Sequence, residues 1–259
     1  KRQRPELLYE SDEMKAIMDS IQRVGRTDAN CLIVGESGTG KTALAKYMHK
    51  ISDRQDKPFI SVNCASLPRE LVESELFGYV KGAFTGAKSG GKTGLFEAAN
   101  HGTLLLDEIS ELPFSAQAKL LSAIQEKEIL PIGATAPVKI DVKIVAATNK
   151  DLTKLIESNE FRADLYYRLN IFELTIPPLR QRKKDIIPLA TYFLNQFDTQ
   201  YGKSHTFSKD TIPLLLSYAW KGNVRELRHV IERITVMVDD FSIEPHHLPK
   251  NIFSVVSYD

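Results

Sequence analysis

The sequence has only two cysteines and no long apolar run among its 259 residues. Cys31 and Cys64 each lie beside an apolar stretch, so we expect buried thiols in a reducing cytosol rather than a disulfide. No apolar stretch approaches the roughly 18 residues that span a bilayer, and no signal peptide is visible. These absences exclude a disulfide-stapled scaffold and a membrane protein, and they predict a cytoplasmic location.

The chain also has little excess charge of either sign. Its 34 lysines and arginines nearly balance 33 aspartates and glutamates, so a net charge of +1 provides no strong overall field for nucleic acid or an anionic membrane. The histidines are scattered, and His246-His247 lacks companion ligands, so we expect a solvated loop pair rather than a metal site. Because the sequence begins at Lys1 and not at methionine, we expect it to be a fragment of a longer protein.

Two regions differ in their pattern of apolar residues. Up to residue 176, short apolar segments alternate with helical stretches or loops, which predicts a parallel sheet covered on both faces. The expected strands are residues 31–34, 59–62, 103–107, 142–147 and 171–176. After Pro177-Pro178, helical apolar spacing continues over residues 183–197, 208–219 and 223–238, and no strand pattern returns. We therefore predict an α/β domain over residues 1–177, a small helical domain over residues 178–250 and a tail over residues 251–259.

A glycine-rich segment after the first expected strand matches the phosphate-binding pattern G-x-x-x-x-G-K-[ST] at every required position. Its glycines let backbone N–H groups surround phosphate oxygens, Lys41 reaches the β- and γ-phosphates, and Thr42 can ligate Mg²⁺. The alternative is a glycine-rich turn between core elements. We predict that the chain binds a nucleoside triphosphate through this segment, which consists of Gly35, Glu36, Ser37, Gly38, Thr39, Gly40, Lys41 and Thr42.

Polar residues follow each of the next three expected strands. In open parallel sheets, ligands bind beyond the carboxyl ends of the strands, so these residues are expected to share one edge. Asp107 can hold Mg²⁺ through water, and Glu108 can orient and deprotonate an attacking water. The alternative is that both are solvated acids at the start of a helix. Asn63 and Asn149 are weaker candidates, because asparagine is common as a cap where a strand meets a helix.

The segment 73–87 contains the run Gly-Ala-Phe-Thr-Gly-Ala and is predicted to contain no core element. Glycines at positions 78, 82, 86, 90, 91 and 94 predict a flexible loop with one exposed aromatic residue, Phe84. A loop with an apolar tip usually contacts another molecule. The alternative is a surface loop in which Phe84 packs back into the core.

Taken together, these motifs resemble the AAA+ ATPase domain of bacterial enhancer-binding proteins, the activators of RNA polymerase that carries the sigma-54 factor. The run from Gly82 to Ala87 is identical to the GAFTGA signature of that family. The resemblance covers the chain from about residue 7 to about residue 250. The other matching segments are Glu75 to Gly78, Gly102 to Glu108, Phe161 to Leu169 and Gly222 to Leu227.

The resemblance implies an AAA+ P-loop NTPase fold with a five-stranded parallel sheet and a small all-α lid. It implies hydrolysis of ATP with Mg²⁺ in a hexameric or heptameric ring that remodels the sigma-54 polymerase complex. The implied contacts with sigma-54 are Gly82, Ala83, Phe84, Thr85, Gly86 and Ala87, with Phe84 and Thr85 at the tip. The resemblance also implies that Asn63 is a switch residue that pairs with Glu108, that Asn149 is sensor I and that Arg225 is sensor II. It implies nucleotide contacts by Leu8 and Tyr9, and it implies that Arg162 and Arg168 are arginine fingers.

A geometric point qualifies the two arginines. The two arginines are expected on one helix, where six residues of separation put their side chains about 120° apart, so they do not share a face. One is then expected to hold the subunit interface while the other contacts phosphate, where a guanidinium stabilises the charge of the transition state. The alternative for either arginine is a surface salt bridge.

Three positions depart from the family's pattern. The family commonly has glutamate after the loop lysine, whereas Thr42 restores the hydroxyl that ligates Mg²⁺. The usual His-Glu pair before the GAFTGA loop is replaced by Tyr79-Val80, which removes a charge near that loop. The segment before sensor I, usually arginine-valine-glycine-glycine, is Pro131-Ile132-Gly133-Ala134, so the second pore-facing loop is expected to make different contacts.

Two other functions remain open at this point. A different AAA+ machine, such as a helicase or clamp loader, would show ATPase activity stimulated by DNA alone, but the GAFTGA loop and the near-neutral charge oppose it. A non-enzymatic regulator would use ATP only as an assembly switch, which the presence of Glu108 and the arginines opposes. About ten residues follow Leu248-Pro249, too few for a helix-turn-helix unit, so binding to enhancer DNA is expected to need a domain outside this chain.

Overall fold

The computed structural model describes residues 7–83 and 90–253. The chain forms two compact units, and each is described by itself. The sheet unit comprises residues 19–35 and 41–175. The helical unit comprises the described residues within 1–18, 36–40 and 176–259. The phosphate loop thus begins and ends in the sheet unit, while residues 36–40 between its ends pack with the helical unit.

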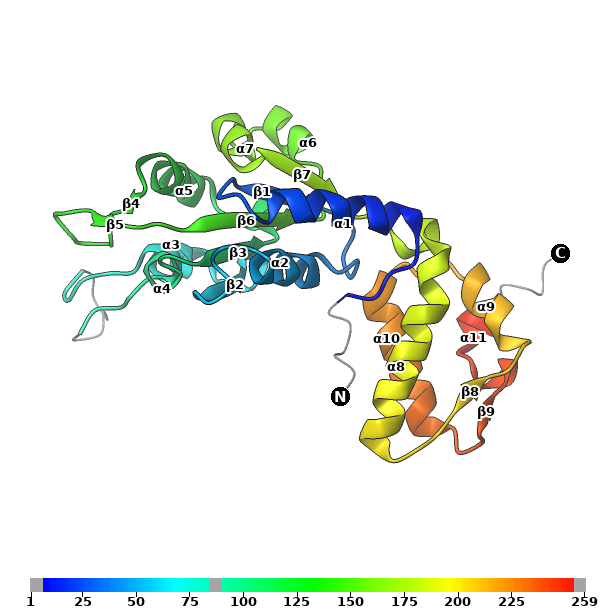
Figure 1. The fold of residues 1–259 in the computed structure, drawn as a ribbon. Coiled ribbons are helices and arrows are strands. Elements are labelled where there is room, and N and C mark those ends of the chain that lie inside the picture. The colour runs from blue at the N-terminus through cyan, green and yellow to red at the C-terminus, as the bar shows by residue number, and fades with distance from the viewer. Residues whose placement is uncertain (1–6, 84–89, 254–259) are drawn as a thin grey trace. The chain divides into compact units, whose positions relative to one another are not determined.

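The sheet unit is built on five parallel strands, as the sequence predicts (Figure 1). Their spatial order is β2-β3-β6-β1-β7. The observed limits differ from the predicted ones by one residue at several ends. The strands are β1 (Cys31–Val34), β2 (Phe59–Asn63), β3 (Thr103–Asp107), β6 (Lys143–Thr148) and β7 (Phe172–Thr175).

Helices cover both faces of this sheet (Figure 1). On one face, alternate strand residues such as Leu104, Leu106 and Ile144 are buried in one core with side chains of α3, α4, α5 and α7. On the other face, α2 packs against β3 and β6, and His49 of α2 lies 2.9 Å from the Thr103 hydroxyl. The helices are α1 (Asp12–Val24), which crosses between the units, α2 (Lys41–Lys50), α3 (Val72–Phe77), α4 (Leu95–Ala98), α5 (Phe114–Glu126), α6 (Leu152–Glu157) and α7 (Ala163–Leu169).

The prediction that the segment 73–87 lacks a core element is wrong for its first part. Residues up to Phe77 form α3, and Leu76 and Phe77 are fully buried. Phe77 stacks on Phe96 of α4, with 5.5 Å between the ring centroids. Two glutamates and a serine in this short helix concealed its apolar face, which rests on only Val72, Leu76 and Phe77.

The sheet unit also contains an antiparallel pair that the sequence did not predict. Strands β4 (Glu128–Ile129) and β5 (Val138–Lys139) are only two residues long each, which is too short for a period-2 pattern to be read. They flank the segment 131–134 that departs from the pattern of the enhancer-binding proteins. Cys31 and Cys64 are free and buried, as predicted, and burial raises the pKa of each thiol to about 12.

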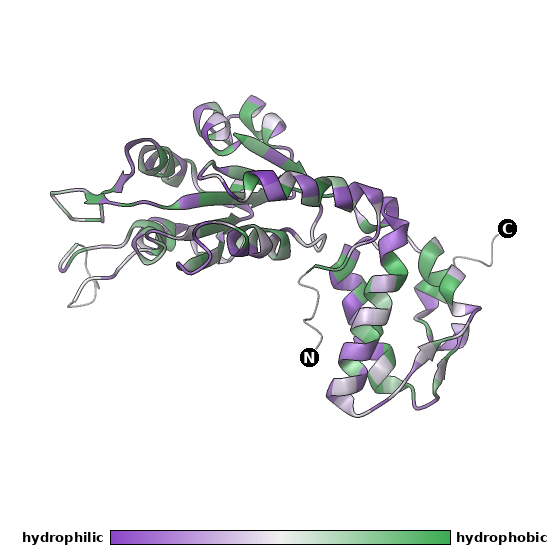
Figure 2. Ribbon diagram, viewed as in Figure 1, coloured by the Kyte–Doolittle hydropathy of each residue, from purple (hydrophilic) through white to green (hydrophobic). Residues whose placement is uncertain are grey.

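The helical unit has its own apolar core, centred on the fully buried Trp220. The indole nitrogen of Trp220 donates to the Leu215 carbonyl at 2.8 Å, which satisfies its one polar atom. As Figure 2 shows, α8 and α10 carry hydrophobic and hydrophilic residues side by side along their length, as amphipathic helices do. The helices are α8 (Ile186–Tyr201), α9 (Thr211–Ser217), α10 (Asn223–Met237) and α11 (Lys250–Phe253).

The helical unit also contains a parallel strand pair, β8 (Thr206–Phe207) with β9 (Ser242–Ile243). The sequence predicts no strand here, because two-residue strands leave no periodic signal. Next to this pair, both ring nitrogens of His205 face acceptors, the Asp198 carboxylate and the Val238 carbonyl. In the part of the chain that the structure describes, no helix is long and apolar enough to cross a membrane.

A buried carboxylate fixes the start of α1 in the helical unit. Asp185 is fully buried and accepts hydrogen bonds from the backbone nitrogens of Glu10 and Ser11, at 2.6 and 2.7 Å. It also accepts from the Ser11 hydroxyl at 2.8 Å, and Arg182 lies 3.5 Å away. These contacts satisfy the buried charge and anchor the chain segment that contains Leu8 and Tyr9.

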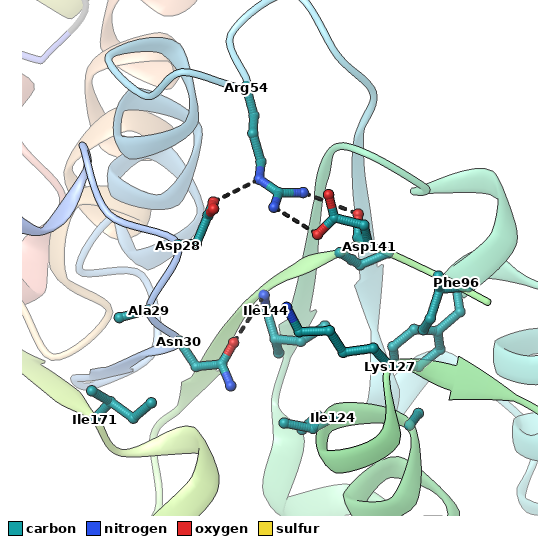
Figure 3. Close-up of a pocket in the computed structure, with 13 residues that line it drawn as sticks. Asp28, Ala29, Asn30, Arg54, Phe96, Ile124, Lys127, Asp141, Ile144 and Ile171 are labelled. Atoms are coloured by element: carbon teal, nitrogen blue, oxygen red, sulfur yellow. Dashed lines mark hydrogen bonds and ion pairs between the residues drawn. The ribbon is translucent and has the colours of Figure 1, made fainter.

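A pocket of about 130 Å³ lies at the amino ends of β1 and β6 (Figure 3). At its rim, Arg54 donates to Asp28 at 2.9 Å, to the Asp141 carboxylate at 2.8 Å, and to the carbonyls of Gly102 and Asp141 at 3.2 and 3.0 Å. One guanidinium therefore joins the segments that lead into three neighbouring strands, β1, β3 and β6. Every donor and acceptor that it uses is held inside the sheet unit.

We expect Arg54→Ala to lower the free energy of unfolding by about 2 kcal/mol at neutral pH, because two carbonyls and two carboxylates lose a shared donor. Arg54 holds the pKa of Asp141 below its ordinary value of 3.8, so this stabilisation is present above that value and is lost as the pH falls through the lowered pKa. Denaturant unfolding at about pH 7 and about pH 3 measures the difference in the free energy of unfolding between the wild type and the variant. This difference should be smaller at the lower pH. Arg26→Ala, an exposed arginine of the same unit, serves as control and should change stability by less than about 0.5 kcal/mol.

Candidate active site

The polar residues after the strands lie along one edge of the sheet, as the sequence predicts. Because all five strands are parallel, their carboxyl ends meet at that edge. Asn63 and Asp107 are paired in register at the ends of β2 and β3. β6 ends at Thr148, whose carbonyl accepts from the backbone nitrogen of Gly35, the first residue of the phosphate loop, at 3.1 Å.

The loop lysine and threonine contact the two carboxylates that follow β3. Lys41 is buried, and its ammonium group lies 3.7 Å from Glu108 and donates to the Gly35 carbonyl at 2.9 Å. The Thr42 hydroxyl donates to Asp107 at 3.2 Å. Residues far apart in sequence thus form one cluster, in the sheet unit, of a cation, a hydroxyl and two carboxylates. This cluster can hold phosphate and a hard cation and can take up a proton.

Glu108 has a backbone conformation that is unusual for a residue other than glycine. Its φ of 52° and ψ of 51° lie in the left-handed region, which costs on the order of 1 kcal/mol or more. The conformation turns the chain sharply between β3 and the short helix at Ile109–Glu111, and the Glu108 carboxylate accepts from the backbone nitrogen of Asn149 at 3.3 Å. The carboxylate is therefore held between Lys41 and the end of β6.

Asn63 forms a local cap in this structure. Its side-chain oxygen accepts from the backbone nitrogen of Ala65 at 2.9 Å and so caps the short helix at Cys64–Ser66. Among the described residues, the side chain of Glu108 is within bonding distance of Lys41 and of the Asn149 nitrogen, and not of Asn63. The capping role was an alternative from the sequence, and the switch role of Asn63 stays a prediction.

The residues around Thr42 fit Mg²⁺ in the chemistry of their donor atoms. Mg²⁺ prefers oxygen ligands and keeps several waters, so one hydroxyl and one carboxylate are a sufficient protein contribution. The Thr42 hydroxyl and the Asp107 carboxylate already lie within hydrogen-bond distance of each other, at 3.2 Å. Within the described part of the chain, no cluster of three or more His, Cys, Asp or Glu side chains offers an alternative metal site.

The middle of the phosphate loop is held by the helical unit. The Arg225 side chain donates to the Ser37 hydroxyl at 2.8 Å, and Arg182 donates to the Thr39 carbonyl at 2.8 Å. At Gly38, with φ of +79°, an added Cβ would lie 2.3 Å from the Gly222 carbonyl oxygen, so only glycine fits. Of the two residues predicted near the nucleotide, Leu8 packs against the core of this unit and Tyr9 is half-buried.

The expectation that both predicted arginine fingers lie on one helix is wrong for Arg162. Arg162 is the N-cap residue of α7, with an extended backbone, and only Arg168 lies within the helix. The Arg162 guanidinium is bound to Asp164 through two hydrogen bonds, at 3.0 and 2.8 Å, and lies 5.5 Å from the centre of the Phe114 ring. Arg168 is exposed, and its carbonyl accepts from the Asn30 side chain at 3.0 Å.

The GAFTGA segment is described only in part, since Phe84, Thr85, Gly86 and Ala87 lie outside the described residues. The chain just before it is fixed on two sides. Tyr79 exchanges backbone hydrogen bonds with Lys92 at 2.9 and 2.8 Å. Val80 donates to the Ile132 carbonyl at 3.0 Å, and Ile132 donates to the Gly78 carbonyl at 2.9 Å. Two segments depart from the pattern of the enhancer-binding proteins, Tyr79-Val80 and Pro131 to Ala134. They are therefore joined to each other by backbone hydrogen bonds.

Comparison with known proteins decides the family. The chain matches the Sigma-54 interaction domain over residues 7–175 and the AAA+ ATPase lid domain over residues 180–257. The chain belongs to the Sigma-54 interaction domain family. Regulatory protein AtoC of Escherichia coli is 47% identical over 247 residues, which are 95% of this chain and 53% of that protein. Nitrogen fixation protein AnfA of Azotobacter vinelandii is 44% identical over 95% of this chain and 46% of its own length.

A solved structure agrees with this assignment. NtrX from Brucella abortus, in complex with ATP, is 33% identical and superposes with a TM-score of 0.87 over 96% of this chain and 55% of that chain. The fold of this sigma-54 interaction domain is therefore the AAA+ P-loop fold with a helical lid. The chain spans about half the length of these relatives.

Sequence reasoning missed a residue that positions Arg162. Gln117 of α5 is fully buried and donates to the carbonyls of Leu112 and Glu160, both at 3.0 Å. Its oxygen accepts from the backbone nitrogen of Arg162 at 2.9 Å. A single amide thus joins three segments of the domain. A glutamine between the apolar residues Ala116, Leu120 and Leu121 of one helix was the only sequence signal for it.

We expect Gln117→Leu to destabilise the sigma-54 interaction domain by about 2–4 kcal/mol, because the similar-sized side chain leaves three backbone groups without a partner. Gln125→Leu is the matched control, since Gln125 lies on the same helix and is exposed, and it should change stability by less than about 0.5 kcal/mol. Denaturant unfolding of the three proteins checks this. Equal stability of the Gln117 and Gln125 variants would contradict the buried role of Gln117.

Proposed function

We propose that this sigma-54 interaction domain hydrolyses ATP to ADP and phosphate in a ring of identical subunits. In this proposal, hydrolysis drives the loop Gly82–Ala87 against sigma-54 and remodels the closed polymerase complex into an open one. The main support is the cluster of Lys41, Thr42, Asp107 and Glu108 in a chain of this family, because each residue is of the type that the chemistry requires.

In the hydrolytic step, the oxygen of a water attacks the γ-phosphorus, and the bond from that phosphorus to the β–γ bridging oxygen breaks. Glu108 accepts the proton of the water, and ADP leaves with the electron pair of the broken bond. Lys41 neutralises charge on the β- and γ-phosphates. Thr42 and Asp107 are the residues that would hold Mg²⁺, which supplies further neutralisation of phosphate charge when bound.

The same proposal assigns the remaining site residues. Asn149 contacts Glu108 through its backbone and is suited to report the state of the γ-phosphate. Arg225 extends from the helical unit to Ser37 of the phosphate loop, which suits the sensor II role. Arg162 and Arg168 are solvent-accessible and are proposed to complete the site of a neighbouring subunit, where a guanidinium stabilises the transition state. Asn63 is proposed as the link between nucleotide state and the loop.

The proposed partners are the RNA polymerase holoenzyme with sigma-54 and further copies of this chain in a hexamer or heptamer. AtoC is named a regulatory protein, in keeping with this role. A near-neutral net charge of +1 favours a protein partner over nucleic acid, and contact with enhancer DNA is assigned to a domain outside this chain. The proposed location is the cytoplasm.

The shared active site predicts that two inactive variants restore activity when mixed. Lys41→Ala removes the phosphate contact of its own subunit, and Arg162→Ala removes the finger given to the neighbour, so each alone should lose nearly all ATPase activity. In an equal mixture, half of the subunits keep Lys41 and half of their neighbours keep Arg162, so about a quarter of the wild-type rate should return.

Steady-state phosphate release measures this rate. The control is a mixture of Lys41→Ala with the double variant Lys41→Ala/Arg162→Ala, which has no complete site and should stay inactive. No recovery in the first mixture would contradict the role of Arg162 in a shared site, and the same mixture made with Arg168→Ala tests the second arginine.

The contact with sigma-54 predicts a complex that depends on nucleotide state. With ADP and aluminium fluoride, which mimic the transition state of hydrolysis, the wild-type domain should retain purified sigma-54 on a native gel. Thr85→Ala should lose this complex and keep its ATPase activity, whereas Thr199→Ala, an exposed threonine of the helical unit, should behave as wild type. No complex with an active wild-type ATPase, or ATPase stimulated by DNA alone, would contradict the sigma-54 assignment.

A further inference from the structure

The phosphate loop contains a carboxylate at a position where the binding pattern specifies none. Glu36 directly follows Gly35, inside the loop whose backbone N–H groups surround phosphate. A negative charge at this place opposes the binding of a triphosphate unless a cation compensates it. Lys41 cannot serve both purposes, because its ammonium group is directed to the Gly35 carbonyl and Glu108 and is assigned to phosphate.

A cation from the helical unit is paired with this carboxylate. Arg180 donates to both oxygens of Glu36, at 2.8 and 2.6 Å, in the bidentate geometry that gives the strongest arginine–carboxylate pairs. The Arg180 pairing is the main reason that the pKa of Glu36 is lowered to about 2, so the carboxylate is ionised at neutral pH. Arg180 lies just after Pro177-Pro178, in a short helix at Leu179–Gln181.

Asn223 holds both partners of the Glu36–Arg180 ion pair in position. Asn223 is fully buried, and its side-chain nitrogen donates to Glu36 at 3.1 Å and to the Ser37 carbonyl at 3.0 Å. Its side-chain oxygen accepts from the backbone nitrogen of Leu179, the residue before Arg180, at 2.8 Å. One asparagine thus holds both partners of the ion pair in place. It does so with φ of 54°, a left-handed conformation that costs energy in any residue except glycine.

We propose that Arg180 is the counter-charge that makes the phosphate loop of this domain compatible with a triphosphate. In this proposal, Glu36 binds the short helix Leu179–Gln181 through Arg180 and is not a nucleotide ligand. Arg180 is then a positioning residue that acts on the nucleotide through Glu36. This inference rests on the proposed binding of ATP. The role of Arg180 is additional to the proposed binding of ATP, because the phosphate-binding pattern requires no charge at position 36 and does not include Arg180.

A counter-charge role and a purely structural role of the Glu36–Arg180 pair predict different binding results. If the pair only anchors the loop, loss of either partner weakens nucleotide binding, and loss of both is no better. If Arg180 compensates a charge, Arg180→Ala leaves the Glu36 carboxylate near the phosphates without its arginine, and a second change that removes the charge of this carboxylate restores binding. The effect should also be larger for ATP than for ADP and smaller at high salt, because it scales with ligand charge and is screened.

The variants are Arg180→Ala, Glu36→Gln and the double variant, each in the full chain described here. The side chains of Arg180 and Glu36 are both 41% exposed, so the pair adds little to the stability of the fold and the variants should fold. Lys184→Ala is the matched control. Lys184 lies four residues further along and forms an exposed ion pair with Asp12, so its loss removes the same charge from the same unit.

The measurement is the dissociation constant for ATP and for ADP by calorimetric titration, at about 0.05 M and about 0.5 M salt. We expect Arg180→Ala to weaken ATP binding about tenfold at low salt, and Glu36→Gln, the double variant and Lys184→Ala to stay within about threefold of wild type. Unfolding curves recorded beside the titrations verify that each variant is folded.

A double variant as weak as Arg180→Ala, or an equal loss for ATP and ADP at both salt concentrations, would overturn the counter-charge role while leaving the proposed function intact. Unchanged ATP affinity in Arg180→Ala would overturn it as well. A wild-type chain that binds neither nucleotide would overturn the proposed function and this inference together.

Discussion

The parallel pairing of β3 with β6 and of β6 with β1 is the constraint on which the candidate site depends. Parallel strands end at one edge, so Asp107, Thr148 and Gly35 come within reach of one another although more than a hundred residues separate the first and last along the chain. The strands can stay parallel because helices bury both faces of the sheet. The candidate site at the carboxyl edge of the sheet therefore depends on the apolar core. The buried side chains determine the register of the strands, and this register determines where the carboxylates of Asp107 and Glu108 lie.

The parts of the site that could be predicted from the sequence are those in which residue type and position along the chain are enough. The phosphate loop is one contiguous run, and Asp107-Glu108 directly follows an apolar strand, so neither needs knowledge of a distant partner. Gln117 and Arg180 could not be found in this way. Gln117 is bound by backbone groups of residues 112, 160 and 162, and Arg180 by a carboxylate 144 positions away. Their roles exist only after the chain has folded.

The fold was predictable to a similar degree and for a similar reason. The five central strands stand out as short apolar runs, and α8 and α10 have enough residues for a helical period to be read. The pairs β4–β5 and β8–β9 consist of two residues per strand, and their pairing is decided by tertiary contacts. α3 was missed because three polar residues interrupt its short apolar face. Arg162 was placed on a helix because sequence patterns do not locate the first helical residue reliably.

Two polar residues of the candidate site and its surroundings have an unfavourable left-handed backbone conformation. Glu108 and Asn223, both with positive φ, cost more than glycine would at the same place. Each position needs a side chain that glycine lacks. Glu108 supplies a carboxylate between Lys41 and Asn149, and Asn223 supplies the amide that joins Glu36 to Leu179. At these two positions, the unfavourable backbone conformation directs a polar side chain toward its partners.

The charges of the phosphate loop are balanced at both of its ends. Lys41 faces Glu108, and Glu36 faces Arg180, so neither charged residue of the loop lacks an opposite charge. The two pairs differ in geometry, since Arg180 forms two short hydrogen bonds to Glu36, whereas the Lys41 ammonium group lies 3.7 Å from Glu108. In the proposed function, a phosphate that binds Lys41 would compete with the Lys41–Glu108 pair and leave the Glu36–Arg180 pair in place. This would free Glu108 from Lys41 when ATP binds, while the Glu36–Arg180 pair would keep its side of the loop in place.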